Sequence, residues 1–262
     1  MIAPAEDDFD ITDPDVVREV VADARPDVVI NAAAYTAVDR AESEASLAQR
    51  VNVNAVGTLA AAARVAGARF AHVSTDFVFD GTAHRPYPPD ALPNPLGVYG
   101  RTKLDGELAA AEFHPAPLIV RTAWVYAAVG NNFVATMLRL MRERTEIHVV
   151  ADQIGTPTHV PTVAKALWTL LGGGHSGVFH ATDAGIASWY DFAVAIHEEA
   201  RSIGLLTDDV AIHPIRTEDY PTPARRPAYS VLDKTATWAI TGLSRHWRNE
   251  LRDCLSMMRS IA

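Results

Sequence analysis

The chain has 262 residues, of which 48% are hydrophobic, and a formal net charge of −9, so it can form one large or two modest domains. The acidic balance disfavours a surface for nucleic acid or anionic membranes, and the single cysteine excludes an internal disulfide. No apolar run reaches the length that spans a bilayer, and the N-terminus has no signal-peptide pattern, so we expect a cytoplasmic protein that binds neither nucleic acid nor membrane.

Short apolar runs typical of buried strands alternate with helical patterns along much of the chain. The first helix begins at Asp13-Pro14, an N-cap followed by proline at the first helical position. In chain order, we predict a helix at 13–24, a strand at 28–30, a helix at 45–66, a strand at 70–73, a helix at 100–111, a strand at 118–120, a helix at 132–144 and a strand at 177–180. This alternation predicts an α/β fold with a parallel sheet covered on both faces.

Two proline-rich stretches interrupt this alternation. The segment 80–97 joins the strand that ends near Thr75 to the helix that carries Tyr99, and loops of this length are usually functional. The segment 220–227 precedes a terminal helix from about Ser244. Because the last third lacks the regular alternation, we predict a smaller substrate-side domain there.

Side chains that suit carbonyl reduction flank the first of these loops. Tyr99 and Lys103 are four residues apart and share one face of a helix, where the ammonium is expected to lower the pKa of the phenol. Thr75 ends an apolar strand, and sites in open α/β sheets lie at the carboxyl ends of strands. Thr75 could then hold a carbonyl while Tyr99 exchanges a proton with it. The spacing alone is weak, since Tyr99 could be a packed aromatic residue, Lys103 a solvated residue and Thr75 a cap.

Four motifs resemble those of the extended short-chain dehydrogenase/reductases. They are residues 31–39 (NAAAYTAVD), 74–81 (STDFVFDG), 99–103 (YGRTK) and 121–126 (RTAWVY). Three more narrow the resemblance to the dTDP-4-dehydrorhamnose reductases: 131–133 (NNF), 152–158 (DQIGTPT) and 221–227 (PTPARRP). The resemblance runs to about Arg252 and implies a Rossmann-like doubly wound parallel sheet with a smaller C-terminal substrate domain.

The resemblance implies reduction of dTDP-4-dehydro-L-rhamnose with hydride from NADPH or NADH in dTDP-rhamnose biosynthesis, and it allows for Mg²⁺ and for a homodimer. Tyr99 would protonate the C4 oxygen as hydride reaches C4. Lys103 would lower the pKa of Tyr99 and bind the nicotinamide ribose, and Thr75 would orient the carbonyl. Both NAD and NADP stay open, because the residues that distinguish them lie at the end of the family's second strand, where this chain only begins.

The other implied site residues divide between the two ligands. Those expected to line the cofactor are Asp10, Ile11, Asn31, Ala32, Ala33 and Ala34, and those expected to line the sugar nucleotide are Thr36, Val38, Asp76, Phe77, Trp124 and Arg225. Alternatives stay open: Trp124 as plain core, Asp76 as a structural cap, and Arg225 or Arg226 in a surface ion pair instead of on the substrate phosphates. The ten histidines show no metal-ligand spacing, so no metal site is predicted, and His72, within a strand, is expected in the core or in the layer behind the site.

The sequence departs from the family pattern in two places. Phe77 stands where the family usually has tyrosine. The strand, glycine-rich turn and helix that open such a cofactor domain are missing; Met1 to Pro4 instead resemble the end of the family's second strand, and Asp8 to Asp13 the segment after it. We therefore expect a truncated cofactor domain, 1–125 plus about 145–182, and a substrate-binding portion, about 126–144 and 183–262.

Other functions remain open at this point. A chain without the phosphate loop could be an inactive truncated fragment, or a non-catalytic binding partner like the regulatory subunit of methionine adenosyltransferase. Another sugar-nucleotide reductase or an epimerase could carry the same catalytic residues. The combination of Thr75, Tyr99 and Lys103 with the 221–227 loop favours the reductase.

Overall fold

Four parallel strands form the central sheet of the computed structural model, which describes residues 2–4 and 9–261. The strands lie in the order β1 (Val28–Asn31), β2 (Arg69–Thr75), β3 (Leu118–Thr122) and β8 (Gly177–His180). In register, Asn31 lies beside His72, and Thr75 lies beside Thr122. The four predicted strands and their parallel pairing are confirmed.

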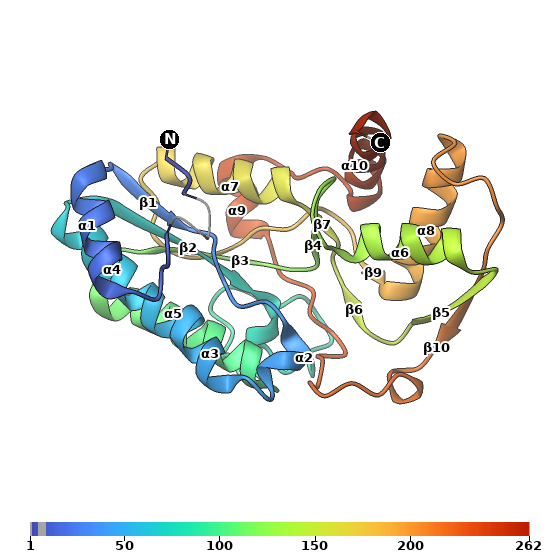
Figure 1. Ribbon diagram of the computed structural model, residues 1–262, viewed down its shortest axis with the longest axis horizontal. Helices are drawn as coiled ribbons and strands as arrows, with labels where there is room; N and C mark the ends of the chain where they lie inside the picture. The colour runs from blue at the N-terminus through green and yellow to red at the C-terminus, as the bar shows by residue number, and fades with distance from the viewer. Residues whose placement is uncertain (1, 5–8, 262) are drawn as a thin grey trace.

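Helices cover both faces of this sheet: α1 (Pro14–Ala24), α4 (Ala55–Val65) and α5 (Val98–Phe113) on one face, and α7 (Val160–Gly172) and α9 (Thr235–Thr241) on the other (Figure 1). Phe70 of β2 packs against α1 and α4, whereas the next residue, Ala71, packs against α7. Because successive residues of a strand point to opposite faces, β2 is apolar on both sides. The predicted Rossmann-like, doubly wound arrangement is confirmed.

The first two helical predictions differ in how well they match. Helix α1 begins as predicted, because the Asp13 side chain accepts hydrogen bonds from two backbone N–H groups of the first turn and Pro14 opens the helix. The predicted helix 45–66 consists of α3 (Ala45–Gln49), a π-helical turn (Arg50–Asn54) and α4. π-helical turns are rare in proteins, and those that occur are often at functional sites. The hydrophobic periodicity of the sequence does not indicate this turn.

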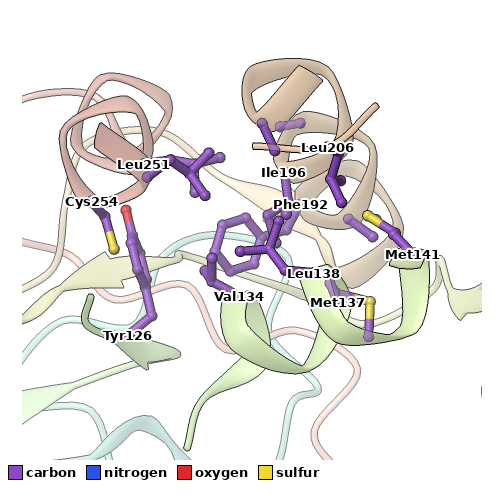
Figure 2. Close-up of a cluster of buried hydrophobic side chains, with 14 of the residues drawn as sticks. Tyr126, Val134, Met137, Leu138, Met141, Phe192, Ile196, Leu206, Leu251 and Cys254 are labelled. Atoms are coloured by element: carbon purple, nitrogen blue, oxygen red, sulfur yellow. The ribbon is translucent and has the colours of Figure 1, made fainter. Parts of the chain in front are cut away.

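A second hydrophobic cluster, shown in Figure 2, forms outside the central four-stranded sheet. Tyr126, Phe192 and Leu251 are buried in it. Its elements are α6 (Phe133–Glu143), β5 (Glu146–Val150), α8 (Trp189–Ser202), β10 (Ala211–Ile215) and α10 (Trp247–Ile261), with β5 and β10 paired in parallel. The helix predicted at 132–144 is α6, and the terminal helix begins at Trp247 instead of near Ser244. Helices α7 and α8 and the pair of β5 with β10 were not predicted.

Short elements complete the chain. They are α2 (Val38–Ala41), β4 (Val125–Tyr126) parallel to β7 (Thr158–His159), β6 (Ile154–Gly155) antiparallel to β9 (Ala187–Ser188), and 3₁₀ turns at Asp76–Val78 and Thr217–Asp219. The predicted loop 80–97 contains no helix or strand, and Tyr87 within it forms an isolated bridge with Leu232. The C-terminal third of the chain therefore reaches the loop that follows the Thr75 strand.

The expectation that the chain opens with the end of a strand is not met. Ile2–Pro4 form no strand, because in the part of the chain that the structure describes they pair with no neighbour. Met1 and Asp8, which belong to the two segments compared with the family's second strand, lie outside the described residues. Among the described helices, none has both the length and the apolar character needed to cross a membrane.

Candidate active site

Three predicted site residues lie at the carboxyl edge of the sheet. Thr75 ends β2 and is paired with Thr122, the last residue of β3. Trp124 follows two residues after the end of β3, and Asn31 ends β1. The carboxyl ends of parallel strands lie at one edge of a sheet, which is where ligands bind in open α/β folds. The topology therefore places these residues around a common edge.

The first turn of α5 brings Tyr99 to Thr75. A Cβ atom on Gly100 would lie 2.2 Å from the carbonyl oxygen of Phe77, so only glycine lets α5 approach the turn at 76–78 this closely. The rings of Phe77 and Tyr99 then meet edge to face, with centroids 5.4 Å apart. The Thr75 hydroxyl lies close enough to the Tyr99 phenol to act on its pKa. The dipeptide Tyr99-Gly100 thus combines a functional side chain with the space that positions it.

The pKa of Tyr99 is raised. Burial of the phenol raises the pKa to about 12, the nearby Thr75 hydroxyl opposes this rise, and the nearby Asp76 carboxylate adds to it. The expectation that Lys103 lowers this pKa is not met, because the Lys103 amine donates instead to the carbonyl oxygen of Val73 at 2.8 Å. Tyr99 is therefore a protonated phenol at neutral pH in this structure.

Lys103 is a buried amine, so it is not the solvated helix residue that the sequence left open. Its side chain is 2% exposed, and its Nζ lies 3.2 Å from Nε2 of His72. Burial lowers its pKa to about 8, while the Glu107 carboxylate opposes this effect. Lys103 can therefore change protonation state close to neutral pH.

Asp76 is a buried carboxyl group beside the Thr75 hydroxyl. Its Oδ1 accepts a hydrogen bond from Thr75 Oγ1 at 3.1 Å, and among the described residues its Oδ2 has no hydrogen-bond partner. Burial raises the pKa of Asp76 to about 6, against the opposing effect of the nearby Ser230 and Thr75 hydroxyls. Thr75 also caps the following turn by accepting from the Phe77 N–H at 3.2 Å. The capping role of Thr75 therefore coexists with its position against Tyr99.

Buried asparagine side chains hold the loop after β1 in place, while part of the loop is exposed to solvent. Asn31 is buried, and its Oδ1 accepts from the Ala33 N–H at 3.1 Å, whereas Ala32 and Ala33 are exposed. Asn52, which lies in the π-helical turn, accepts from the Tyr35 N–H at 2.8 Å. The Asn52 amide also donates to Thr102 of α5 at 3.1 Å. The π-helical turn thereby fixes the 31–35 loop against the helix that carries Tyr99 and Lys103.

The two cofactor-side residues nearest the N-terminus have local roles in the structure. Asp10 is exposed, and its carboxylate accepts from the backbone N–H and the hydroxyl of Thr12, both at 2.8 Å. Ile11 is half-buried and packs against the cluster under α1 and α4. Neither residue contacts Tyr99 or Lys103 in the described hydrogen-bond and hydrophobic contacts.

Trp124 is a half-buried aromatic residue held in an unusual backbone conformation. Its φ angle is 47°, and its ring stacks on Trp189 with centroids 3.6 Å apart. A Cβ atom on Gly155 would lie 2.5 Å from the Trp124 ring, so glycine is required at that position. A non-glycine residue at positive φ persists only where its surroundings hold it there, and such residues are concentrated at functional sites. Trp124 is thus neither plain core nor free surface.

The two arginines of the proline-rich loop differ sharply. Arg226 forms a two-point ion pair with Asp39, with Nη2 to Oδ2 at 2.8 Å and Nη1 to Oδ1 at 3.1 Å. Arg225 is exposed. The alternative of an ion pair therefore applies to Arg226. Arg225 is the arginine of this loop that remains exposed to solvent. Thr36 is also exposed, and Val38 begins α2, which carries Asp39.

A buried ion pair under α5 was missed from the sequence. Glu107 accepts from Arg121 Nε at 2.9 Å and from Nη2 at 2.7 Å, and Ser74 donates to the same carboxylate at 2.5 Å. Arg121 belongs to the RTAWVY motif and Ser74 precedes Thr75, so both lay inside quoted motifs. Their pairing needed the three-dimensional register of β2, β3 and α5. The ion pair fixes the helix of Tyr99 to β3, and the Ser74 hydrogen bond fixes it to the strand of Thr75.

The contacts unite part of the predicted site. Thr75, Asp76, Phe77 and Tyr99 form one group, and Lys103 connects to Asn31 through His72. No hydrogen bond or ring contact in the described part of the chain joins Trp124 or Arg225 to Tyr99. Within residues 2–4 and 9–261, no group of three or more His, Cys, Asp or Glu side chains could hold a metal ion.

Comparisons with known proteins identify the family to which the chain belongs. The family model for the RmlD substrate binding domain matches residues 1–260. A dTDP-4-dehydrorhamnose reductase from Burkholderia thailandensis is 47% identical over 96% of this chain and 88% of its own length. The Escherichia coli K12 enzyme of the same name is 44% identical over 86% of this chain and 77% of its own length.

Solved structures give the same result. A dTDP-4-dehydrorhamnose reductase from Clostridium acetobutylicum superimposes with a TM-score of 0.92 and 41% identity, covering 98% of this chain and 90% of its own. The Bacillus anthracis enzyme in complex with NADP has a TM-score of 0.91 and 36% identity, covering 97% and 89%. The chain therefore belongs to the RmlD family of dTDP-4-dehydrorhamnose reductases, which are nicotinamide-dependent oxidoreductases.

Proposed function

We propose that this chain reduces dTDP-4-dehydro-L-rhamnose to dTDP-L-rhamnose with hydride from a nicotinamide dinucleotide, as a step of dTDP-rhamnose biosynthesis. The observation that carries the proposal is the Thr75 hydroxyl beside the Tyr99 phenol at the carboxyl edge of the sheet, with the buried amine of Lys103 one helical turn away. Family membership supports the choice of substrate.

The chain's own residues supply the proton. Thr75 donates a hydrogen bond to the C4 carbonyl oxygen and orients it, and Tyr99 transfers its phenol proton to that oxygen. When bound, the dinucleotide supplies the hydride that adds to C4. The hydride and the Tyr99 proton together convert the ketone into the alcohol, and the phenolate that remains regains its proton afterwards. Val73 and His72 hold the Lys103 amine in place, and we propose that this amine binds the nicotinamide ribose.

The residues present fit the nicotinamide end of the cofactor. Exposed Ala32 and Ala33 have small side chains that let a ligand approach the backbone, and the Asn31 side chain fixes this backbone by accepting from the Ala33 N–H. We propose that Ala34, Asp10 and Ile11 line the rest of this side. NADPH is the proposed donor because the Bacillus anthracis relative is described with NADP. Mg²⁺ stays an expectation of the family resemblance.

The substrate side is proposed to comprise Thr36, Val38, Asp76, Phe77, Trp124 and Arg225. Exposed Arg225 would bind the diphosphate, because a guanidinium suits paired phosphate oxygens. The Phe77 ring meets the Tyr99 ring edge to face and supports it without a hydroxyl of its own. The division into two domains remains a proposal. Because Ile147 and Val149 of β5 pack in the second hydrophobic cluster, we propose that the chain crosses back from the substrate-binding portion to the cofactor domain after β5. A homodimer and a cytoplasmic location also remain predictions.

The proposal is tested by following the loss of NADPH absorbance with dTDP-4-dehydro-L-rhamnose. We expect Tyr99→Phe to lower kcat by roughly 10²–10⁴-fold, the usual contribution of a general acid, while NADPH binding stays within about twofold. The matched control is Tyr190→Phe, which lies on α8 beside the second cluster and should leave turnover unchanged. Full turnover by Tyr99→Phe would remove Tyr99 from its role. A folded chain that binds NADPH and reduces only other keto sugar nucleotides would redirect the proposal to a different substrate.

A further inference from the structure

His72 forms a buried connection between the cofactor-side loop and Lys103. It lies on β2, is 0% exposed, and is approached on both ring nitrogens. Nδ1 lies 3.2 Å from Nδ2 of Asn31, and Nε2 lies 3.2 Å from Nζ of Lys103. The sequence predicts a residue of the core or of the layer behind the site at this position, and the burial of His72 agrees with this. The contacts also place it between two residues proposed to serve the cofactor.

Both groups that approach the ring are hydrogen-bond donors. The Asn31 oxygen accepts from the Ala33 N–H at 3.1 Å, so the Asn31 amide nitrogen faces His72. Burial and the Lys103 charge lower the pKa of His72 well below its usual value, so the ring is neutral. A neutral imidazole has one N–H and one acceptor nitrogen. His72 can therefore accept a hydrogen bond from Asn31 or from an ammonium on Lys103, but not from both.

Two arrangements satisfy both ring nitrogens of His72. If Lys103 is a neutral amine, the His72 proton sits on Nε2 and points at the lone pair of Lys103, while Nδ1 accepts from the Asn31 amide. If Lys103 is an ammonium, Nε2 accepts from it and the proton sits on Nδ1. Asn31 must then turn its oxygen toward His72, which takes that oxygen away from the Ala33 N–H.

We propose that His72 is a positioning residue whose tautomer couples the protonation of Lys103 to the orientation of Asn31 and to the availability of the Ala33 N–H. The ammonium form releases this N–H toward the exposed side of the loop, where an oxygen atom of a bound ligand can accept from it. By linkage, a ligand that accepts from Ala33 favours the ammonium of Lys103. The value of this coupling for catalysis rests on the proposed function, whereas the coupling itself does not.

Other charged groups around Lys103 do not provide the same connection. Glu107, on the same helix, raises the pKa of Lys103 but is held by Arg121 in a buried ion pair. Asp76 acts on Tyr99, at the Thr75 end of the site. Within the described contacts, His72 is the group that touches both Lys103 and the cofactor-side loop.

The test is an NMR titration of ¹⁵N-histidine-labelled protein, since the two neutral tautomers have different ring nitrogen shifts. From about pH 6 to about pH 10, the His72 proton should move from Nδ1 to Nε2 with a midpoint near the Lys103 pKa of about 8. The His72→Gln variant assigns the signals. A single tautomer throughout, or a ring that protonates with an ordinary histidine pKa, would overturn the proposal.

Three variants make the test specific. Lys103→Met should abolish the change and leave the proton on Nε2, because Asn31 is then the only donor to the ring. Asn31→Asp should hold the proton on Nδ1 across the whole range, because a carboxylate only accepts. Lys165→Met, which removes an amine on α7, should leave the His72 transition unchanged. A transition that survives in Lys103→Met would contradict the coupling, and none of these spectra requires turnover, so failure of the reductase proposal is seen separately.

Discussion

The ion pair between Asp39 and Arg226 fastens the proline-rich loop to the segment after β1, and we predict that Asp39→Ala loosens this loop. Asp39 accepts from both terminal nitrogens of Arg226 and from the Ala224 N–H at 3.2 Å. Arg226 holds the pKa of Asp39 below its usual value. The pair joins residues far apart in the sequence, and Arg225 lies in the same loop. Its loss should therefore affect both stability and substrate binding.

The expected magnitude follows from these contacts and their exposure. A hydrogen bond to a charged group contributes about 1.5–3 kcal/mol when well shielded. The side chains of Arg226 and Asp39 are 24% and 38% exposed, so solvent screening lowers this contribution, and we expect Asp39→Ala to cost about 1–3 kcal/mol in total. Because the pKa of Asp39 is depressed, this stability is present above its unfolded pKa and is lost as the pH falls through the folded value.

Urea unfolding at neutral pH measures the loss, and steady-state kinetics measures its consequence. The KM for the sugar nucleotide should rise about tenfold or more while kcat changes little, because the catalytic group around Tyr99 is untouched. The matched control is Asp15→Ala, which breaks the highly exposed pair of Asp15 and Arg18 and should cost less than about 0.5 kcal/mol. If Asp39→Ala unfolds at the same urea concentration as Asp15→Ala and keeps the wild-type KM, the proline-rich loop does not depend on the ion pair of Asp39 with Arg226.

Two further predictions concern buried charges near the site. Glu107→Gln leaves the buried Arg121 guanidinium without its carboxylate and should lower the free energy of unfolding in urea by about 3–5 kcal/mol. The control Glu143→Gln, on the exposed face of α6, should lower it by less than about 1 kcal/mol. Equal effects of the two variants would refute the argument that the Glu107 pair is buried. The raised pKa of Asp76 contributes stability below its unfolded pKa that is lost as the pH rises through about 6. The wild type should therefore lose roughly 3 kcal/mol relative to Asp76→Asn between about pH 4 and about pH 7, and a constant difference would contradict the assignment.

The sequence predicts the central sheet because its strands are short apolar runs buried on both faces. Phe70 and Ala71 are adjacent and pack on opposite helical layers, and this produces an unbroken apolar pattern. The strand β5 gives no such signal, since only part of it is buried and its partner β10 is about sixty residues away and largely exposed. The π-helical turn is invisible for another reason: it changes the hydrogen-bond register of a helix without changing its composition.

The candidate site divides in the same way. Thr75, Tyr99 and Lys103 are predictable because strand ends and helical spacing place them without long-range information. The direction of the Lys103 amine is not predictable from spacing, because it depends on the Val73 carbonyl and on His72 in a neighbouring strand. The same holds for Arg225 and Arg226, which are adjacent in sequence and equivalent in chemistry. Only the position of Asp39 in the fold separates them.

The raised pKa of Tyr99 bears on which direction of chemistry this arrangement favours. Hydride addition to a ketone leaves an alkoxide, which is a stronger base than a phenolate even when the pKa of the phenol is about 12. Proton transfer from Tyr99 is therefore downhill without help from Lys103. Oxidation of an alcohol would need the phenolate as a base, and burial together with Asp76 makes that form costly. The electrostatics around Tyr99 thus agree with its proposed role as the proton donor in reduction.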